Sequence, residues 1–289
     1  MVNTVDEFRE EFGGPYCRWD HDLIGAYIDD ELVGYQYTYH LPGADTIERC
    51  YVFGTTHPAH RGLGVGSTML RWGVERATER LASGGGGPKV IRVDTFENRA
   101  DAIALFGSFD FTPSRYFSDM EQDLVVRREV GIPAGVSIVR WPDDDPAFDE
   151  TVRVMKNTAF ADHWGSSPTA PEGWIQKVRG FGARRDLSFV ALDRDARPVG
   201  LVLTHRYPDD DVVVGRRVAN LDTVGTLREW RGRGVATALI GTALNDCLDH
   251  GLERASIEVD SSSPTGANRL YESLGFSVVR RTITFDRPI

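Results

Sequence analysis

Residues 227–236 read LREWRGRGVA and residues 57–66 read HPAHRGLGVG, so one pattern of arginine and glycine occurs twice in the chain. The two arginines, Arg61 and Arg231, lie 170 positions apart. A run rich in β-forming residues precedes each copy, and apolar residues at helical spacing follow it. The predicted strands are 48–55 and 218–226, and the predicted helices are 67–81 and 237–248.

The parallel continues on both sides of the two glycine turns. Downstream, each copy has a second predicted strand and then a related motif, LFGSFDF ending at Phe111 and LYESLGF ending at Phe276. Upstream, each copy has two strand-like runs that predict a hairpin. The second strands are 90–95 and 254–259, and the hairpins pair 23–28 with 32–39 and 188–192 with 199–205.

This repeat divides the 289 residues into two similar modules. The stretch with the weakest pattern between them is VGIPAG at 130–135, and we place the boundary there. The sequence predicts an N-terminal domain over 1–133 and a C-terminal domain over 136–289. Both are of mixed α/β class, because each alternates strands with helices.

Composition excludes several classes of protein. The chain is 41% hydrophobic and 26% charged, as soluble globular proteins are. It carries 33 basic and 43 acidic residues, and the first 50 residues alone hold 3 basic against 11 acidic. Nucleic acids and anionic membranes select basic patches, so neither is expected as a partner. We interpret most of the acidic excess as a solvated surface.

Targeting and metal signals are equally sparse. No window approaches the ~18 consecutive apolar residues of a membrane span, and the first residues are acidic where a signal peptide would be basic and then apolar. A cytoplasmic location is therefore expected. The three cysteines, Cys17, Cys50 and Cys247, have no CxxC spacing, which predicts buried free thiols and no metal site.

The glycine turns themselves indicate a phosphate site. A strand that ends in a glycine-rich turn and opens into a helix points backbone N–H groups and the positive end of the helix dipole at one place. Glycine permits close approach of a pyrophosphate. The turns match neither the Walker A pattern nor GxGxxG, so they do not predict a P-loop or a dinucleotide fold.

A strand, then (Q/R)xxGxG/A, then a helix and a later LYxxLGF motif resembles the GNAT N-acetyltransferase superfamily. Two such modules in one chain resemble the tandem GNAT proteins typified by mycothiol synthase. The resemblance implies two tandem GNAT-type domains, each a splayed mixed β-sheet flanked by helices. It also implies acetyl-CoA as co-substrate, with its pyrophosphate in the turn and its pantetheine arm beside the preceding strand, and direct acetyl transfer to an amine.

The family's acetyl-CoA positions carry over to both copies. In the second copy they are the strand end and the turn with its first helical residues: Val224, Gly225, Thr226, Arg231, Gly232, Arg233, Gly234, Val235, Ala236 and Thr237. In the first copy the matching residues are Gly54, Thr55, Thr56, Arg61, Gly62, Leu63, Gly64, Val65 and Gly66.

The resemblance assigns proton transfer to the second copy. Tyr271 stands where the family commonly has a tyrosine that protonates the departing thiolate, and its counterpart Phe106 has no proton to give. Asp222 stands where family members often have an acidic residue that accepts the ammonium proton, and the counterpart in a gapless alignment is Val52. We therefore expect the C-terminal domain to be catalytic and the N-terminal domain to be non-catalytic, with or without a bound CoA.

Structural interpretations of the same residues stay open. Tyr271 also fits a core aromatic, and Asp222 also fits a strand residue bonded to a nearby loop. His205 and the Asp162–Trp164 cluster are candidates for shaping the acceptor site or for an alternative base, and equally fit packed or surface residues.

The acceptor is the least determined part of the prediction. Residues 157–174 lie where the family walls the acceptor cleft, and their aromatics suggest a small organic amine. The negative net charge favours a cationic amine, with an aminosugar or antibiotic as one choice. Two alternatives from other classes are a non-catalytic acyl-CoA-binding or sensing protein and a protein or peptide N-acetyltransferase. The chain is expected to be a monomer or a homodimer.

Overall fold

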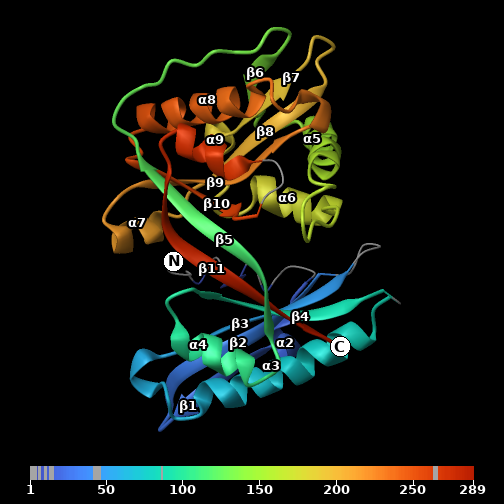
Figure 1. Cartoon of the computed structure of the whole chain (residues 1–289), viewed down its shortest axis with the longest axis vertical. Helices are drawn as coiled ribbons and strands as arrows, with labels where there is room; N and C mark the ends of the chain where they lie inside the picture. Colours follow the sequence, from blue (N-terminus) through green and yellow to red (C-terminus); the bar gives the residue numbers. More distant parts are fainter. Residues whose placement is uncertain are drawn as a thin grey trace. The chain divides into compact units, whose positions relative to one another are not determined.

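The chain folds into two compact mixed α/β units, one of residues 118–279 and one of residues 5–117 with 280–289 (Figure 1). The computed structural model describes residues 5, 8–9, 12, 16–41, 47–85, 87–262 and 266–289. The predicted fold class is therefore confirmed. The predicted boundary near residue 133 stays a prediction about the sequence repeat.

The N-terminal unit is a sheet in the order β1-β2-β3-β4-β11. Strands β3 and β4 are parallel, and the other neighbours are antiparallel. Its strands are β1 (Leu23–Ile28), β2 (Glu31–Leu41), β3 (Glu48–Thr56), β4 (Lys89–Phe96) and most of β11 (Ser277–Pro288). Its helices are α2 (Trp19–Asp22), the 3-10 turn η1 (Pro58–His60), α3 (Val65–Ala82) and α4 (Ala100–Gly107).

Local sequence accounts for these elements. Asp29 and Asp30 have φ of 49° and 65°, the left-handed conformations that a tight β1–β2 turn requires and that Asp tolerates. Helix α3 buries Met69, Leu70, Ala77 and Leu81, which are spaced to lie on one face. Alternation along β2 places Gly34, Gln36 and Thr38 on one face and three tyrosines on the other, where Tyr35 contacts Phe8 and Tyr37 contacts Phe12.

The C-terminal unit is a sheet in the order β5-β10-β9-β8-β7-β6. Its strands are β5 (Thr112–Asp123), β6 (Ser137–Arg140), β7 (Phe189–Leu192), β8 (Pro198–His205), β9 (Val218–Thr226) and β10 (Arg254–Asp260). Its helices are α5 (Pro146–Ala159), α6 (Pro171–Arg179), α7 (Pro208–Val214), α8 (Val235–Asp249) and α9 (Ala267–Ser273), with 3-10 turns η2 (Arg185–Leu187) and η3 (Arg228–Trp230).

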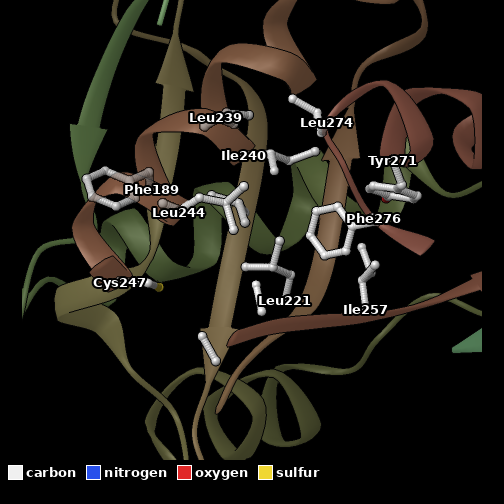
Figure 2. Packing of buried hydrophobic residues seen from close by; sticks show 14 of the residues in the cluster. Phe189, Leu221, Leu239, Ile240, Leu244, Cys247, Ile257, Tyr271, Leu274 and Phe276 are labelled. Atoms are coloured by element: carbon white, nitrogen blue, oxygen red, sulfur yellow. The ribbon is translucent and has the colours of Figure 1, made fainter. Parts of the chain in front are cut away.

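Two apolar layers cover the two faces of this sheet. Helices α8 and α9 supply Leu239, Leu244 and Tyr271 to one layer, in which Figure 2 shows Tyr271 beside Phe276. Helices α5 and α6 form the other layer, and its buried members are Trp141, Val152, Met155, Ala159, Trp174, Val178, Val190, Leu201 and Leu203. The alternation of β7 and β8 residues between the two layers explains why these strands are almost continuously apolar.

A buried carboxylate joins α5 to α6. Asp149 accepts hydrogen bonds from Trp141 Nε1 at 2.8 Å and from Arg179 Nε at 2.9 Å, and Arg185 lies 3.1 Å from the same carboxylate. Burial by itself raises the pKa of Asp149, but the bonds from Arg185, Trp141 and Arg179 outweigh it and hold that pKa below its usual value. The two helices are thereby fixed to each other.

The strands β5 and β11 each serve both units. Residues 112–117 of β5 belong to the N-terminal unit and residues 118–123 to the C-terminal unit, while β11 passes in the opposite sense. The end of β11 pairs with β4 from Thr282 opposite Phe96 to Pro288 opposite Val90. The last strand of the chain therefore completes the sheet of the first module, a feature that the sequence repeat did not predict.

Most sequence-based elements are confirmed. Both hairpins, both glycine turns and all four strands around them form within one or two residues of the predicted bounds. Helices α3 and α8 begin two residues earlier than predicted, directly after Gly64 and Gly234. The three cysteines are buried, and none of them is in a disulfide bond. In the described ranges, none of the helices combines the length and the apolar character needed to cross a bilayer.

The exchanged strand yields a stability prediction. Phe285 on β11 is 2% exposed and packs against Phe106, with ring centroids 5.5 Å apart. We expect Phe285→Ala to lower the free energy of unfolding by about 3–5 kcal/mol, because it removes a fully buried ring. Amide exchange should then accelerate in α3 and β4 of the N-terminal unit, although the substitution lies near the end of the chain. Val279→Ala, at a 54% exposed position of the same strand, serves as the control; faster exchange confined to the C-terminal unit would contradict this assignment.

Candidate active site

In each unit two parallel strands separate after a short paired stretch. Strands β9 and β10 pair only at Val218, Ala219 and Asn220, whereas the other edge of β9 pairs with β8 as far as Thr226. Strands β3 and β4 likewise pair from Glu48 only to Tyr51. One backbone edge of each strand end is therefore left open, as a splayed sheet requires.

Each open strand leads into the glycine turn, and the two turns have the same backbone. Gly62 and Gly232 have φ of 78° and 72°, and Gly64 and Gly234 have φ of 85° and 84°. This left-handed region is costly for residues with a Cβ atom, so glycine is needed at these positions. A Cβ at Gly62, Gly64 or Gly232 would meet nothing within 4 Å, which means that conformation and not packing selects glycine there.

The turns present unused hydrogen-bond donors. Within the described residues, the backbone N–H groups of 232–237 donate to no protein acceptor, and neither do those of 62–67. Neither helix that follows has a side-chain cap. Six N–H groups at the positive end of a helix dipole form a cradle for an anion.

In the C-terminal unit this cradle opens on a cavity of about 380 Å³. Its walls come from the strand end, the turn, the start of α8, the end of α5 and the helix α9. The lining residues are Ala159, His163, Val224, Gly225, Thr226, Trp230, Arg231, Gly232, Gly234, Val235, Ala236, Thr237, Ala267, Leu270 and Tyr271. All but two of the predicted site residues of this unit, Asp222 and Arg233, therefore line one cavity.

Two side chains at the strand end have different roles. The Oγ1 atom of Thr226 is buried without a hydrogen-bond partner, which fits a site that a polar ligand completes. Arg231 is used by the protein itself: its Nε donates to Thr226 O at 3.2 Å, and its other nitrogens bond Ala159 O and Asp162, each at 2.6 Å. The hydrogen bond from Arg231 to Asp162 lowers the pKa of Asp162 to about 2. The guanidinium thus braces the turn, and Arg61 makes the same Nε bond to Thr56 O at 3.3 Å.

Tyr271 lines the cavity from helix α9 and is 6% exposed. Its ring packs edge-on against Phe276, with centroids 6.0 Å apart (Figure 2). No hydrogen bond among the described residues holds its hydroxyl. Burial raises the pKa of Tyr271, so the phenol keeps its proton at neutral pH. The residue is both a core aromatic and a free proton donor.

Asp222 is the extra residue of a β-bulge. Leu203 pairs with Thr223 and Thr204 with Leu221, so Asp222 has no partner on β8. The N-terminal strand β3 pairs with β2 without interruption, and Thr38 lies opposite Val52. Val52 thus corresponds to Leu221, which corrects the gapless alignment of Val52 with Asp222. The bulge and its carboxylate have no counterpart in the first copy.

The Asp222 carboxylate lies in a network of charged and polar groups. Lys177 Nζ is 2.8 Å from one oxygen, the Thr223 hydroxyl donates to the same oxygen at 2.6 Å, and His205 Nδ1 is 3.9 Å from the other. Burial acts to raise the pKa of Asp222, but Lys177, His205 and the hydrogen bonds outweigh it and lower that pKa. Asp222 is therefore an ion-paired carboxylate at neutral pH.

His205 lies behind this carboxylate, buried at the end of β8. Its Nε2 is 2.9 Å from the carbonyl of Lys177, which only accepts, so Nε2 carries the proton. In the neutral ring Nδ1 then accepts from the Tyr207 hydroxyl at 3.1 Å. The histidine that the sequence singled out belongs to the same network as Asp222.

Sequence reasoning missed the two lysines of this region. Lys156 at the end of α5 donates to Thr169 Oγ1 at 2.6 Å and lies 5.4 Å from the centre of the Phe160 ring. Burial, with a further contribution from the charge of Lys177, lowers the pKa of Lys156 to about 8. One sequence signal could have pointed to these lysines: the chain has only three lysines among its 33 basic residues.

The N-terminal unit has a cavity of about 530 Å³ at its own turn, and Gly54, Thr55, Thr56, Arg61, Gly62, Gly64 and Gly66 line it. Leu63 and Val65 lie outside this lining. Phe106 occupies the place of Tyr271: Phe111 N donates to Phe106 O as Phe276 N does to Tyr271 O, and Asp110 has φ of 63° where Gly275 has 90°. The counterpart of the phenol is thus a ring without a hydroxyl.

No group of three or more His, Cys, Asp or Glu side chains in the described ranges is arranged to hold a metal ion. Asp162 and His163 lie side by side, with 3.1 Å between Oδ1 and Nδ1, and the His163 ring packs at a tilt against Phe160 with centroids 4.6 Å apart. His163 reaches the cavity, and Asp162 reaches it only through Arg231.

Comparison with known proteins places the chain among acetyltransferases. The model of the acetyltransferase (GNAT) family matches residues 3–111 and 150–276. The mycothiol acetyltransferase of Nocardiopsis dassonvillei is 25% identical over 280 residues, which cover 91% of this chain and 81% of that protein. The mycothiol acetyltransferase of Thermobispora bispora is 28% identical over 274 residues, 92% of this chain and 82% of that protein.

Solved structures agree on the fold. A GCN5-related N-acetyltransferase from Sphaerobacter thermophilus superposes with a TM-score of 0.72 at 22% identity, covering 93% of this chain and 81% of that one. A tandem GNAT protein from the clavulanic acid biosynthesis pathway gives a TM-score of 0.65 at 17% identity, covering 92% of this chain and 82% of that one. At these identities the likeness concerns architecture alone.

The lowered pKa of Lys156 leads to a pH-dependent stability prediction. The folded chain disfavours the charged amine, so between about pH 8 and 10.5 the unfolded chain binds more protons and stability rises with pH. Lys156→Met should therefore be more stable than the wild type by about 1–2 kcal/mol near pH 7, with the gain lost above the unfolded pKa.

Denaturant unfolding of both proteins across this pH range measures the difference. Arg197→Met removes one positive charge from a 75% exposed side chain and should show no such pH dependence. A Lys156→Met difference that stays constant with pH would contradict the assignment.

Proposed function

The chain belongs to the acetyltransferase (GNAT) family, and we propose that its C-terminal unit transfers the acetyl group of acetyl-CoA to the primary amine of a small molecule. The observation that carries the proposal is the single cavity where the free N–H cradle, the unpartnered Thr226 hydroxyl and the Tyr271 phenol meet. A pyrophosphate fits the cradle because the N–H groups of 232–237 have no other acceptor.

The strand edge prepares the thioester for attack. With the pyrophosphate at the turn, the open edge of β9 from Leu221 to Thr226 runs beside the pantetheine arm. Backbone donors on this edge near Val224 and Gly225 would stabilise the oxyanion that forms at the thioester carbonyl. The Tyr271 phenol, protonated and unpartnered, would give its proton to the thiolate as the amine displaces it.

Asp222 would prepare the amine. An incoming ammonium takes the place of the Lys177 ammonium at the carboxylate, which costs little because one cation replaces another. The amine loses its proton to Asp222, directly or through a water. His205 lies behind the carboxylate, with its Nδ1 3.9 Å from Oδ1. The lowered pKa makes Asp222 a weak base, so holding and orienting the amine is as much its role as accepting the proton.

The N-terminal unit would bind CoA without catalysis. It has the same cradle and a cavity of about 530 Å³, which supports ligand binding, but it has Phe106 in place of the phenol and lacks the bulge carboxylate. A cytoplasmic location and a monomeric or homodimeric state complete the proposal. If the protein acetylates only peptides, or binds acyl-CoA without turnover, the proposed small-molecule acetyltransferase activity is wrong.

The acid role predicts the effect of Tyr271→Phe. The variant keeps the ring that packs on Phe276, so its melting temperature should change little. The rate of CoA release from acetyl-CoA with an accepting amine should fall roughly 10²-fold or more, because the leaving thiolate loses its proton donor. Tyr116→Phe removes the same hydroxyl from a 46% exposed position and should not alter the rate. Equal rates for Tyr271→Phe and the wild type would remove the phenol from the mechanism.

The cradle in each unit predicts two CoA sites in the full chain. Calorimetric titration with CoA should give a stoichiometry of two, falling to one in Gly234→Ala and in Gly64→Ala, because a Cβ at φ near 85° distorts the donors. Gly251→Ala tests the same strain, at φ of 73°, away from both turns. A wild-type stoichiometry of one that Gly64→Ala leaves unchanged would mean that the first cradle is only a scaffold.

A further inference from the structure

Lysine is rare in this chain, and its positions are informative. Of 33 basic residues only Lys89, Lys156 and Lys177 are lysines, and two of these three lie on α5 and α6 of the C-terminal unit. Among the described residues, arginine supplies the cation of most other ion pairs and histidine that of the rest. A lysine differs from an arginine in carrying a compact point charge on a flexible stem, and its pKa shifts readily when it is buried.

The two lysines differ in how their charges are balanced. Lys177 is neutralised by Asp222, with 2.8 Å between Nζ and Oδ2. Lys156 Nζ has the Thr169 hydroxyl at 2.6 Å, and no carboxylate among the described residues lies within 4.0 Å of it. A half-buried ammonium without an anion is costly, and the lowered pKa of Lys156 reflects that cost. The charge of Asp222 also acts on Lys156, so one carboxylate serves two ammonium groups and the region keeps an excess of positive charge.

A short chain of contacts connects this charge to the cavity. Lys156 Nζ lies 5.4 Å from the centre of the Phe160 ring, and that ring lies so close to Gly225 that a Cβ there would come within 2.7 Å of it. The backbone of Gly225 lines the cavity where the thioester is expected. Lys156 does not itself line this cavity, and the Phe160 ring links its ammonium to the part of the cavity where the acceptor must bring its amine.

The position of Lys156 is also fixed. The Asp149 network joins α5 to α6, and Thr169 in turn is held by Asn157, whose Oδ1 accepts from Thr169 N at 2.9 Å. A preorganised charge loses little entropy when a ligand binds. These contacts favour a binding role over a mobile surface lysine.

We infer that the acceptor carries an anionic group close to its primary amine, and that Lys156, assisted by Lys177, binds this group. The inference rests on the proposed function and specifies its substrate class. The acceptor's ammonium would displace Lys177 from Asp222, which leaves two lysine ammoniums and one carboxylate around it. A purely cationic acceptor would add to this excess, whereas a molecule with both an amine and an anion offsets it. Local charge thus opposes the cationic acceptor that net charge first suggested.

Acetylation of matched amines tests the inference. The probes are glycine against glycinamide, β-alanine against β-alaninamide and O-phosphoethanolamine against ethanolamine, which separate a carboxylate from a phosphate. The anionic member of at least one pair should have a kcat/KM roughly tenfold or more above its neutral partner. Equal or better turnover of the neutral members would overturn the inference while leaving the proposed acetyltransferase intact.

Variants of Lys156 then test whether this residue causes the selectivity for anionic acceptors. Lys156→Met should raise the KM for the anionic acceptor roughly tenfold or more and leave the KM for its neutral partner within about twofold. Lys156→Arg should restore part of the loss because the charge returns. Arg197→Met, the exposed control, should change neither value. Selectivity that survives in Lys156→Met would overturn the assignment to this residue.

If no amine of the panel is acetylated, that result counts against the proposed function alone. A binding measurement then tests whether Lys156 binds an anionic group. Protein labelled with ¹³C at lysine Cε should give three resonances, and the one that titrates at about 8 belongs to Lys156. Adding the anionic probes should raise this midpoint by about half a unit or more, because an anion favours the charged amine. A midpoint that responds to no anionic probe, or equally to the neutral ones, would overturn the inference.

Discussion

The separation of two parallel strands is the constraint on which both sites depend. Strands β9 and β10 share only three residue pairs before they part, and β3 and β4 share four. Beyond that point each strand keeps one backbone edge open and ends at the start of a helix. The glycines with φ near 72° to 85° make this junction sharp enough for successive N–H groups to point outward. A cavity and an anion cradle follow from this geometry in both units.

The same frame then acquires different chemistry in its two copies. The glycine turns agree to within a few degrees of φ, and Phe106 and Tyr271 accept the same backbone hydrogen bond. In the proposed proton-transfer groups the copies differ by one hydroxyl and one inserted residue, because the β9 bulge adds Asp222 while β3 pairs regularly. A bulge re-aims a side chain without disturbing the rest of a sheet. A duplicated fold can therefore keep the cradle of free N–H groups in both halves while only one half holds the phenol and the bulge carboxylate.

The local charge around Asp222 is opposite in sign to the net charge of the chain. The chain has a net charge of −10, yet in the C-terminal unit the charges of Lys156 and Lys177 both act on the single carboxylate of Asp222. At physiological ionic strength exposed charges act over only about 8 Å, so the nearby lysines outweigh distant acidic residues for a bound ligand. The Asp149 network matters for the same reason, because it fixes the two helices that carry these lysines.

The sequence by itself determined the local elements: the repeat, both hairpins, the strand, glycine turn and helix of each copy, and the tyrosine that only the second copy has. These depend on neighbouring residues, through turn conformation and hydrophobic spacing, so a pattern is enough to find them. Only the tertiary structure decided that β11 completes the first sheet, that Asp222 occupies a bulge, and that Lys177 pairs with it. Those features join residues far apart in the chain, and one sequence carries no periodic signal for strand register or for long-range ion pairs.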